Sequence, residues 1–395
     1  MRHSNSAMNA KADRLKIGFV FDDSLDKPDG VQQYILSVGS WLSAQGHEVH
    51  YLVGNTERKD LPNVHSLSRN VAVSFNGNDM TIPLPTSRRM LREFLKDQAF
   101  DLLHVQVPYS PWLAGRLIAA ADSHTAVMGT FHIVAISPLV TTASRLLGLY
   151  THTTVRRFDE IVSVSSAAQQ FARSTYGVIT DVVPNAFEYQ RFHDAQPMQC
   201  DDDRLTILFL GRLVTRKGCQ ILLEAVQQLR AKHGDAMFRV LICGKGPELA
   251  RLQQFVDTYE LSNVVTFVGF VSELDKPSYY ASADIAVFPS SGGESFGIVL
   301  VEAMASGRTA VIGGDNVGYR SVLQPQPDLL FNPHESAALA TKLEYLLTNS
   351  KARNDAAAWG TAYATQFDEA VVGAELLRRY AAALHKRRQT AIIEA

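Results

Sequence analysis

Short apolar runs alternate with helical patterns along most of the chain, and this alternation limits the fold to a few architectures. The first unit is a β-rich run at 16–21, a helical pattern at 31–45 that Gly46 ends, and a second run at 48–53. A strand–helix–strand order predicts parallel strands, with the helix covering one face of the sheet. Further strands are expected at 102–106, 126–130, 160–164 and 180–183.

A polar segment at 190–204 interrupts the alternation and is typical of a linker, since it contains Pro197 and three consecutive aspartates. The pattern then restarts, with strands expected at 205–210, 239–243, 264–268, 285–288 and 310–313 and helices at 217–233, 248–259 and 296–306. We therefore predict two α/β domains, 15–190 and 204–368, and a helix at 369–388 that crosses back onto the first domain. Open α/β sheets bind ligands at the carboxyl ends of their strands, so a ligand is expected in a cleft between the domains.

The composition argues against several classes of protein. The 395 residues carry a net charge of −2, whereas a dedicated nucleic-acid binder usually has a basic excess. The three cysteines are odd in number and match no zinc or redox spacing, so we expect no metal site and a reducing, cytoplasmic environment. The polar segment 1–14 lacks the apolar core of a signal peptide, and no run reaches the ~20 apolar residues of a membrane span.

The segment 289–307 is the most informative part of the sequence. It follows an apolar strand, begins with a turn rich in Gly and Ser, and continues as a helix that Gly307 ends. Such a turn is suited to bind an anion, because free backbone N–H groups and the positive end of the helix dipole face it. Glu294 lies in the turn, and Glu302 lies eight residues later in the helix. A tight turn with a surface glutamate is the alternative, but paired acids at this spacing favour a binding site.

This segment resembles the signature of the family-4 retaining glycosyltransferases, which have the GT-B fold of two Rossmann-like domains. It is particularly similar to the phosphatidylinositol mannosyltransferase branch, and the resemblance extends from Lys16 to about Leu384. It implies a retaining transferase that moves a hexose, with mannose favoured, from a nucleotide-diphosphate sugar to an acceptor hydroxyl. GDP-mannose is the favoured donor, no further cofactor is required, and a membrane lipid such as phosphatidylinositol is the expected acceptor.

The resemblance also assigns residues of this segment to the donor. Glu294 would hydrogen-bond hydroxyls of the donor sugar near C3 and C4, and Glu302 would hold the ribose hydroxyls. A carboxylate suits a vicinal diol because it accepts two hydrogen bonds, each contributing roughly 1.5 to 3 kcal/mol. The further donor-binding residues expected in the segment are Gly293, Ser295, Phe296, Gly297 and Ile298.

A basic loop, 211–218, follows the strand at 205–210. Departure of a nucleoside diphosphate leaves negative charge on the departing oxygens, and two fixed cations would stabilise that charge without a metal. Arg212 and Lys217 match the diphosphate-binding arginine and lysine of the family, while Arg216 is expected to face solvent. The alternative is a solvated basic loop with no catalytic role.

His132 follows the strand at 126–130, so its side chain is expected to project into the cleft. A single histidine is more often structural than catalytic, but the resemblance implies contact with the donor sugar and stabilisation of an oxocarbenium-like transition state. Retention would ordinarily suggest a nucleophilic carboxylate, and the sequence offers no clear one. The resemblance instead implies a front-face reaction, in which the leaving phosphate helps to deprotonate the acceptor.

The first loop of the chain also matches the family. Gly30 would let the backbone approach the diphosphate at the start of the next helix, although Asp29 stands where the family usually has a first glycine. Gln32 matches a position that touches the inositol acceptor in the mannosyltransferase branch. A solvent-facing helix residue is the alternative interpretation of Gln32.

Two later segments are expected to bind the nucleotide. Gly244 and Gly246 follow a strand and would let the chain approach the ligand. Related proteins read the base at the positions of Val271, Glu273 and Lys276. These three residues do not separate guanine from uracil.

A row of cations, Arg88, Arg89, Arg92 and Lys96, flanks a helical stripe formed by Met90, Leu91, Phe94 and Leu95. This arrangement suits an interfacial helix on an anionic lipid surface, which would place the protein at the inner face of the cell membrane. An ordinary helix packed on its own sheet is the alternative.

Other functions compete with the transferase. A sugar-nucleotide epimerase can share the double-Rossmann architecture but lacks the paired glutamates, and a non-catalytic nucleotide-sugar binder would leave its ligand intact. A transferase that acts on a soluble or polysaccharide acceptor also fits. An NAD-dependent oxidoreductase is disfavoured, because the turn after the first strand lacks the Gly-x-Gly-x-x-Gly pattern.

Overall fold

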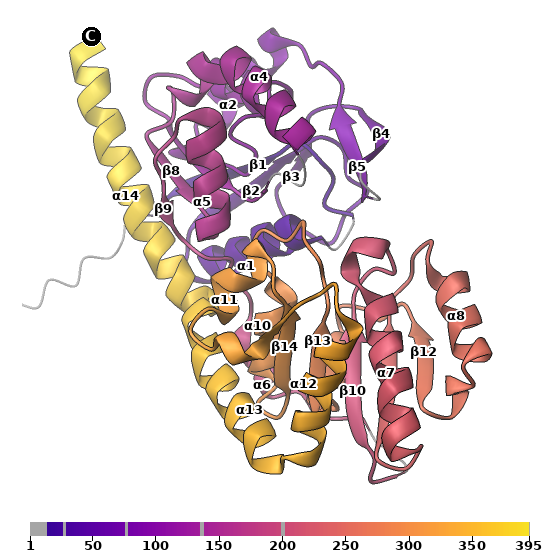
Figure 1. Cartoon of the computed structure of the whole chain (residues 1–395). Helices are drawn as coiled ribbons and strands as arrows, with labels where there is room; N and C mark the ends of the chain where they lie inside the picture. The colour runs from indigo at the N-terminus through magenta and orange to yellow at the C-terminus, as the bar shows by residue number, and fades with distance from the viewer. Residues whose placement is uncertain (1–13, 27–28, 76–77, 135–137, 199–201, 395) are drawn as a thin grey trace, which may run out of the picture.

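The computed structural model describes residues 14–26, 29–75, 78–134, 138–198 and 202–394. These residues form two α/β domains, one above the other in Figure 1. The sheet of the first domain has the order β3-β2-β1-β6-β7-β8-β9, and that of the second has the order β12-β11-β10-β13-β14-β15. Every strand pair within these two sheets is parallel. The double-Rossmann prediction is therefore confirmed.

The strands of the first sheet are β1 (Lys16–Phe21), β2 (Glu48–Val53), β3 (Val64–Ser66), β6 (Leu102–Val105), β7 (Ala126–Phe131), β8 (Glu160–Ser163) and β9 (Asp181–Val182). Those of the second are β10 (Leu205–Leu210), β11 (Phe238–Cys243), β12 (Val265–Gly269), β13 (Ile285–Phe288), β14 (Ala310–Gly314) and β15 (Leu330–Phe331). An antiparallel hairpin of β4 (Asn70–Phe75) and β5 (Asn78–Pro83) stands apart from both sheets.

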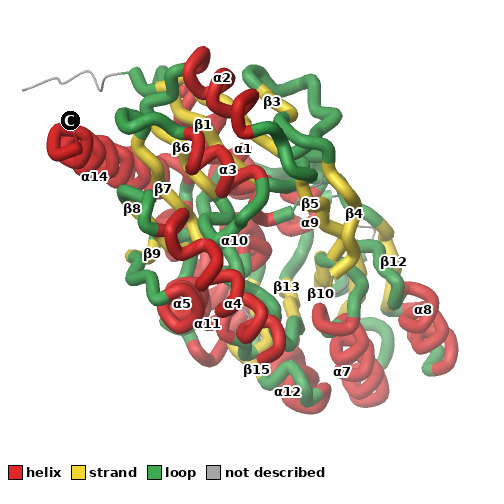
Figure 2. The backbone as a smooth tube through the Cα atoms, turned by 90° about the horizontal axis from the view of Figure 1, so that it is seen from above, coloured by secondary structure: helices red, strands yellow, loops and turns green. Residues whose placement is uncertain are grey.

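Helices cover both sheets. Those before the second sheet are α1 (Gly30–Ala44), α2 (Arg88–Gln98), α3 (Leu113–Ala120), α4 (Pro138–Val155), α5 (Ser166–Phe171) and α6 (Tyr189–His193). Those after its first strand are α7 (Cys219–His233), α8 (Leu249–Thr258), α9 (Lys276–Ala281), α10 (Ile298–Ala305), α11 (Val317–Leu323), α12 (Ser336–Thr348), α13 (Ser350–Ala364) and α14 (Glu369–Glu394). Viewed from above in Figure 2, α2 and α3 lie side by side, and they also contact each other.

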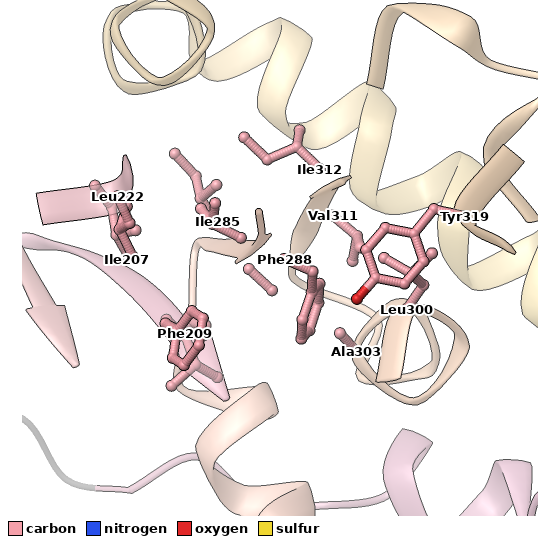
Figure 3. Close-up of a cluster of buried hydrophobic side chains, with 14 of the residues drawn as sticks. Ile207, Phe209, Leu222, Ile285, Phe288, Leu300, Ala303, Val311, Ile312 and Tyr319 are labelled. Atoms are coloured by element: carbon pink, nitrogen blue, oxygen red, sulfur yellow. The ribbon is translucent and has the colours of Figure 1, made fainter. Parts of the chain in front are cut away.

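The strands are apolar because parallel sheets are buried on both faces. In the second domain, Ile207, Ile285, Ile312 and Leu300 of α10 are fully buried in one hydrophobic cluster (Figure 3). Burying each such side chain stabilises the fold by about 1.5 to 3 kcal/mol. This core fixes the carboxyl ends of β10 and β13, from which the loops of the candidate site begin.

The segment 190–204 is not a simple linker, because the short helix α6 overlaps its first residues. Phe192 of α6 is buried in the core of the second domain, and α6 packs against α9 and α10. A five-residue helix has too few residues to show a periodic pattern, which is why the sequence did not reveal it.

The helix α14 crosses from the second domain back along the first, as predicted (Figure 1). At its start, backbone hydrogen bonds join Phe187 to Phe367 and Glu369. Further along, Tyr380 is buried in the first domain, and Arg387 Nη2 lies 2.7 Å from Asp159 Oδ1 in a pair almost closed to solvent. The first domain is thus held at both ends of the crossover.

Replacement of Arg387 by alanine is expected to destabilise the first domain by about 3 kcal/mol, because it removes a charged partner from the buried Asp159 carboxylate. Arg378→Ala is the matched control, since that side chain is 76% exposed and pairs with Glu375 on the same helix. It should cost less than about 1 kcal/mol. Urea unfolding of the two variants makes the comparison, and equal losses would contradict this account of α14.

Candidate active site between the two domains

Glu294 is the centre of a charged cluster. Its Oε1 lies 2.8 Å from Lys217 Nζ and 2.9 Å from Arg216 Nη1, and it accepts a hydrogen bond of 2.9 Å from Ser290 Oγ. Burial acts to raise the pKa of Glu294, but the two cations outweigh it and hold the pKa below its usual value. Glu294 is therefore an ionised, buried carboxylate at neutral pH.

The expectation that Arg216 faces solvent is wrong. Its guanidinium contacts Glu294, and only 21% of its side chain is exposed. A buried carboxylate needs compensating charge, and Arg216 supplies it together with Lys217. The sequence gives no signal for this, since the choice depends on how the loop 211–218 faces the loop 289–297.

The turn before α10 has the conformation that its glycines predict. Gly297 has a φ of +101°, in the left-handed region that disfavours side chains, and α10 begins at the next residue, Ile298. Gly293 has a φ of +73°. Ser295 and Phe296 therefore lie in the chain just before the backbone N–H groups of the first turn of α10.

Glu302 is buried within α10, where Lys276 Nζ lies 3.1 Å from its Oε1 and the Tyr280 hydroxyl donates to its Oε2 at 3.3 Å. Lys276 Nζ also lies 2.7 Å from Glu273 Oε2. Burial acts to lower the pKa of Lys276, but Glu302 and Glu273 raise it above its usual value. The charged Lys276 thus pairs with both Glu302, which is expected at the ribose, and Glu273, which is expected at the base. Val271 lies half-buried on the same loop.

Gly244 and Gly246 are required for a structural reason, the close approach of two loops. A Cβ on Gly244 would lie 1.9 Å from the carbonyl oxygen of Gly211, and a Cβ on Gly246 would lie 2.2 Å from that of Leu213. These glycines therefore let the loop after β11 pack against the loop that carries Arg212 and Lys217. Arg212 itself is half-buried. A direct role of either glycine in nucleotide binding stays a prediction.

His132 directly follows β7 and is buried. Its Nε2 lies 2.8 Å from Gln106 Oε1, and its ring meets the Tyr34 ring edge-on at 5.0 Å between centroids. Burial lowers the pKa of His132 to about 3, so the imidazole is neutral at physiological pH. Gln106 and Tyr34 were not singled out from the sequence. The position of Gln106, at the end of the neighbouring strand, was the available signal.

The two halves of the site touch. Ser165, which follows β8 beside His132, donates a hydrogen bond to the backbone oxygen of Ser295 in the turn, and Ser166 contacts Ser321 of α11 at 3.3 Å.

In Figure 1, α1 lies between the two domains. Gln32 of α1 is 3% exposed and donates to the Ser24 carbonyl, so it is not the solvent-facing residue of the alternative interpretation. Gly30 is exposed, with open space at its Cβ position.

The helix α2 is only partly as expected. Leu91 and Leu95 are buried in the first domain, as the alternative of a helix packed on its own sheet predicts for these two residues. Met90 is 42% exposed. The cation row remains on the surface: Arg88, Arg89, Arg92 and Lys96 are all exposed. None of the helices that the structure describes is long and apolar enough to span a membrane.

The described parts of the chain contain no group of three or more His, Cys, Asp or Glu side chains placed to hold a metal ion. Arg212, Arg216 and Lys217 make the loop after β10 basic. This basic loop is the chemical counterpart of an anionic leaving group.

The chain is similar to known proteins along most of its length. The family model "Glycosyltransferase Family 4" matches residues 28–191, and "Glycosyl transferases group 1" matches residues 191–362. The chain is 32% identical, over 93% of its length and 93% of the relative, to the phosphatidyl-myo-inositol mannosyltransferase of Mycolicibacterium smegmatis. It is 35% identical to the D-inositol 3-phosphate glycosyltransferase of Corynebacterium kroppenstedtii, over 46% of this chain and 41% of that one.

The fold is also that of a solved structure. Anabaena HepE in complex with UDP superposes with a TM-score of 0.68 at 18% identity, covering 92% of this chain and 99% of HepE. At this identity the likeness establishes the fold alone.

Acid should destabilise the first domain because His104 and His132 must stay neutral. Burial lowers the pKa of each to about 3, below the unfolded value of 6.5, so their contribution is present above pH 6.5 and is lost as the pH falls towards 3. Each should cost about 2 kcal/mol between pH 7 and pH 5. His132→Gln should remove the part of this loss in unfolding free energy that comes from His132. His124→Gln, at an exposed histidine, should leave the loss unchanged. Unfolding free energies with the same pH dependence in all three proteins would contradict the assignment.

Proposed function

This chain belongs to glycosyltransferase family 4, and we propose that it transfers mannose from GDP-mannose to an inositol hydroxyl of phosphatidylinositol, with retention of anomeric configuration. The observation that carries the proposal is the Glu294–Lys217–Arg216 cluster, which joins the sugar-binding and diphosphate-binding segments of the family signature. The similarity to the Mycolicibacterium smegmatis enzyme extends along nearly the whole chain and supports the choice of donor and acceptor.

The cluster accounts for the binding of both ends of a sugar diphosphate. Arg212 and Lys217 take the diphosphate, and Glu294 accepts hydrogen bonds from two sugar hydroxyls. Lys217 then interacts with both Glu294 and the phosphate, while Arg216 compensates the charge of the Glu294 carboxylate. Glu302 receives the ribose hydroxyls, with Lys276 and Glu273 beside it.

Transfer needs only one bond to break and one to form. The acceptor oxygen attacks the anomeric carbon on the face that the phosphate leaves, and its proton passes to a phosphate oxygen. The products are a mannoside and GDP, and Arg212 and Lys217 stabilise the negative charge that develops on the departing phosphate before the proton reaches it. A neutral His132 suits a neighbouring oxocarbenium-like centre, because an imidazolium would repel the developing positive charge.

A lipid acceptor requires contact with a membrane surface. The exposed cations Arg88, Arg89, Arg92 and Lys96 supply a basic face on α2, with Met90 among them. Anionic lipids of the cytoplasmic leaflet attract such residues by about 1 kcal/mol each. We place the protein at the inner face of the cell membrane as a peripheral protein.

A soluble acceptor is the second candidate. The partial match to a D-inositol 3-phosphate glycosyltransferase favours it, since inositol phosphate offers the same ring without the lipid. Gln32 at the start of α1 would bind the inositol in either case.

Glu294→Ala and Lys217→Ala should each reduce transfer by about 10²- to 10⁴-fold, because each removes about two charge-assisted hydrogen bonds worth roughly 1.5 to 3 kcal/mol apiece. Release of nucleoside diphosphate from GDP-mannose is the measurement. Lys351→Ala is the control, since Lys351 is 82% exposed and pairs with Asp355 on the surface of α13. Wild-type turnover by a folded Glu294→Ala chain would refute the site.

Reversing Arg88, Arg89 and Arg92 to glutamate should lower binding to phosphatidylinositol vesicles by at least about 100-fold, from about 1 kcal/mol for each lost cation. Reversal of Lys232, Arg251 and Lys351, three exposed cations of the second domain, is the matched control. Vesicle sedimentation measures both. If the two triple variants bind vesicles equally, the α2 face is not the membrane contact.

A further inference from the structure

Gln106 connects His132 to a buried polar network in the first domain. Its Oε1 lies 2.8 Å from His132 Nε2, and its Nε2 donates to the His104 carbonyl oxygen at 3.3 Å. Gln106 is 1% exposed, so water does not compete for these hydrogen bonds. Among the residues that the structure describes, the His132 ring makes no other hydrogen bond.

The second bond fixes the direction of the Gln106 amide. Because its NH₂ group donates to a backbone carbonyl, its oxygen is the atom that faces His132. An amide oxygen only accepts, so the proton of the neutral His132 ring must be on Nε2. The lone pair of the ring is then on Nδ1.

His104 is itself held from two sides. Its Nδ1 lies 2.7 Å from the Tyr380 hydroxyl of α14, and its Nε2 lies 2.7 Å from Thr130 Oγ1 of β7. All three side chains are fully buried. Tyr34 of α1 packs edge-on against both His104 and His132. The carbonyl that orients Gln106 therefore belongs to a residue with little freedom to move.

We propose that Gln106 is a positioning residue for His132: it fixes the Nε2–H tautomer and the plane of the ring, and so presents Nδ1 as a hydrogen-bond acceptor. This tautomer is a property of the free protein. Its consequence for catalysis rests on the proposed function, in which His132 meets the donor sugar. A histidine with Nδ1 protonated, or a tilted ring, would offer that sugar a donor or nothing.

Nuclear magnetic resonance of ¹⁵N-histidine-labelled full-length chain tests the tautomer without any substrate. The His132 signals are identified by their absence in His132→Ala. The wild type should show Nε2 protonated and its proton protected from exchange. Gln106→Leu, which keeps the volume but removes the acceptor, should lose that protection. Gln106→Glu, which keeps an acceptor oxygen at the same reach, should retain a protonated Nε2.

Thr125→Val is the control for general damage to the domain, because Thr125 is buried at the opposite end of β7. It should leave the His132 signals unchanged. An unchanged Nε2–H signal in Gln106→Leu would overturn the proposal, whatever the activity of the enzyme turns out to be. If Gln106→Leu does not fold, the wild-type signals still decide, since protonation on Nδ1 would contradict the proposed hydrogen bond.

A double-mutant cycle then measures the consequence for transfer. Gln106→Leu should lower kcat by about 10- to 100-fold with little change in KM for the donor, the loss typical when the partner that orients a functional histidine is removed. In the His132→Ala background the same change should lower kcat less than about 2-fold, because its target is gone. Equal losses in both backgrounds would show that Gln106 acts on the fold and not through His132.

Discussion

The buried carboxylate of Glu294 is the constraint on which the candidate site depends. A charge removed from water must be neutralised at short range, and here two cations of the loop after β10 do so. The requirement ties the end of β10 to the turn before α10. In the proposed function, the anionic donor would compete for the same cations, so this cluster would also link diphosphate binding to sugar recognition.

The first domain meets this cluster through contacts made by its strand ends. Ser165 reaches the backbone of Ser295, and His132 follows the neighbouring strand. The helix α14 joins the two domains again from the side, with Tyr380 inside the first domain and Glu369 bonded to Ser37. In the proposed function, the second domain would supply most of the donor contacts, and the first would supply His132 and the acceptor residue Gln32.

The sequence predicted the repeating architecture well, because buried parallel strands must be apolar. The spacing of such apolar runs can be recognised along the chain without knowledge of tertiary contacts. The turn at Gly292–Gly297 and the basic loop were likewise visible, since glycine and charge leave local signals. Features set by distant contacts were not: α6 is too short for a pattern, Arg216 turns inward only because Glu294 is there, and Leu91 and Leu95 face the domain core. The role of Gln106 could not be predicted from its neighbours in the sequence, because it depends on contact with His132, which lies 26 residues later.

Product analysis tests the central claim most directly. The full-length chain is supplied with ¹³C-labelled GDP-mannose, phosphatidylinositol vesicles and free inositol phosphate together, and the glycosylated products are identified by mass spectrometry and by the coupling at the anomeric carbon. The account predicts an α-mannosyl lipid with one GDP released for each transfer. Labelled inositol phosphate without mannosyl lipid, a β-linked product, or an intact donor would contradict it.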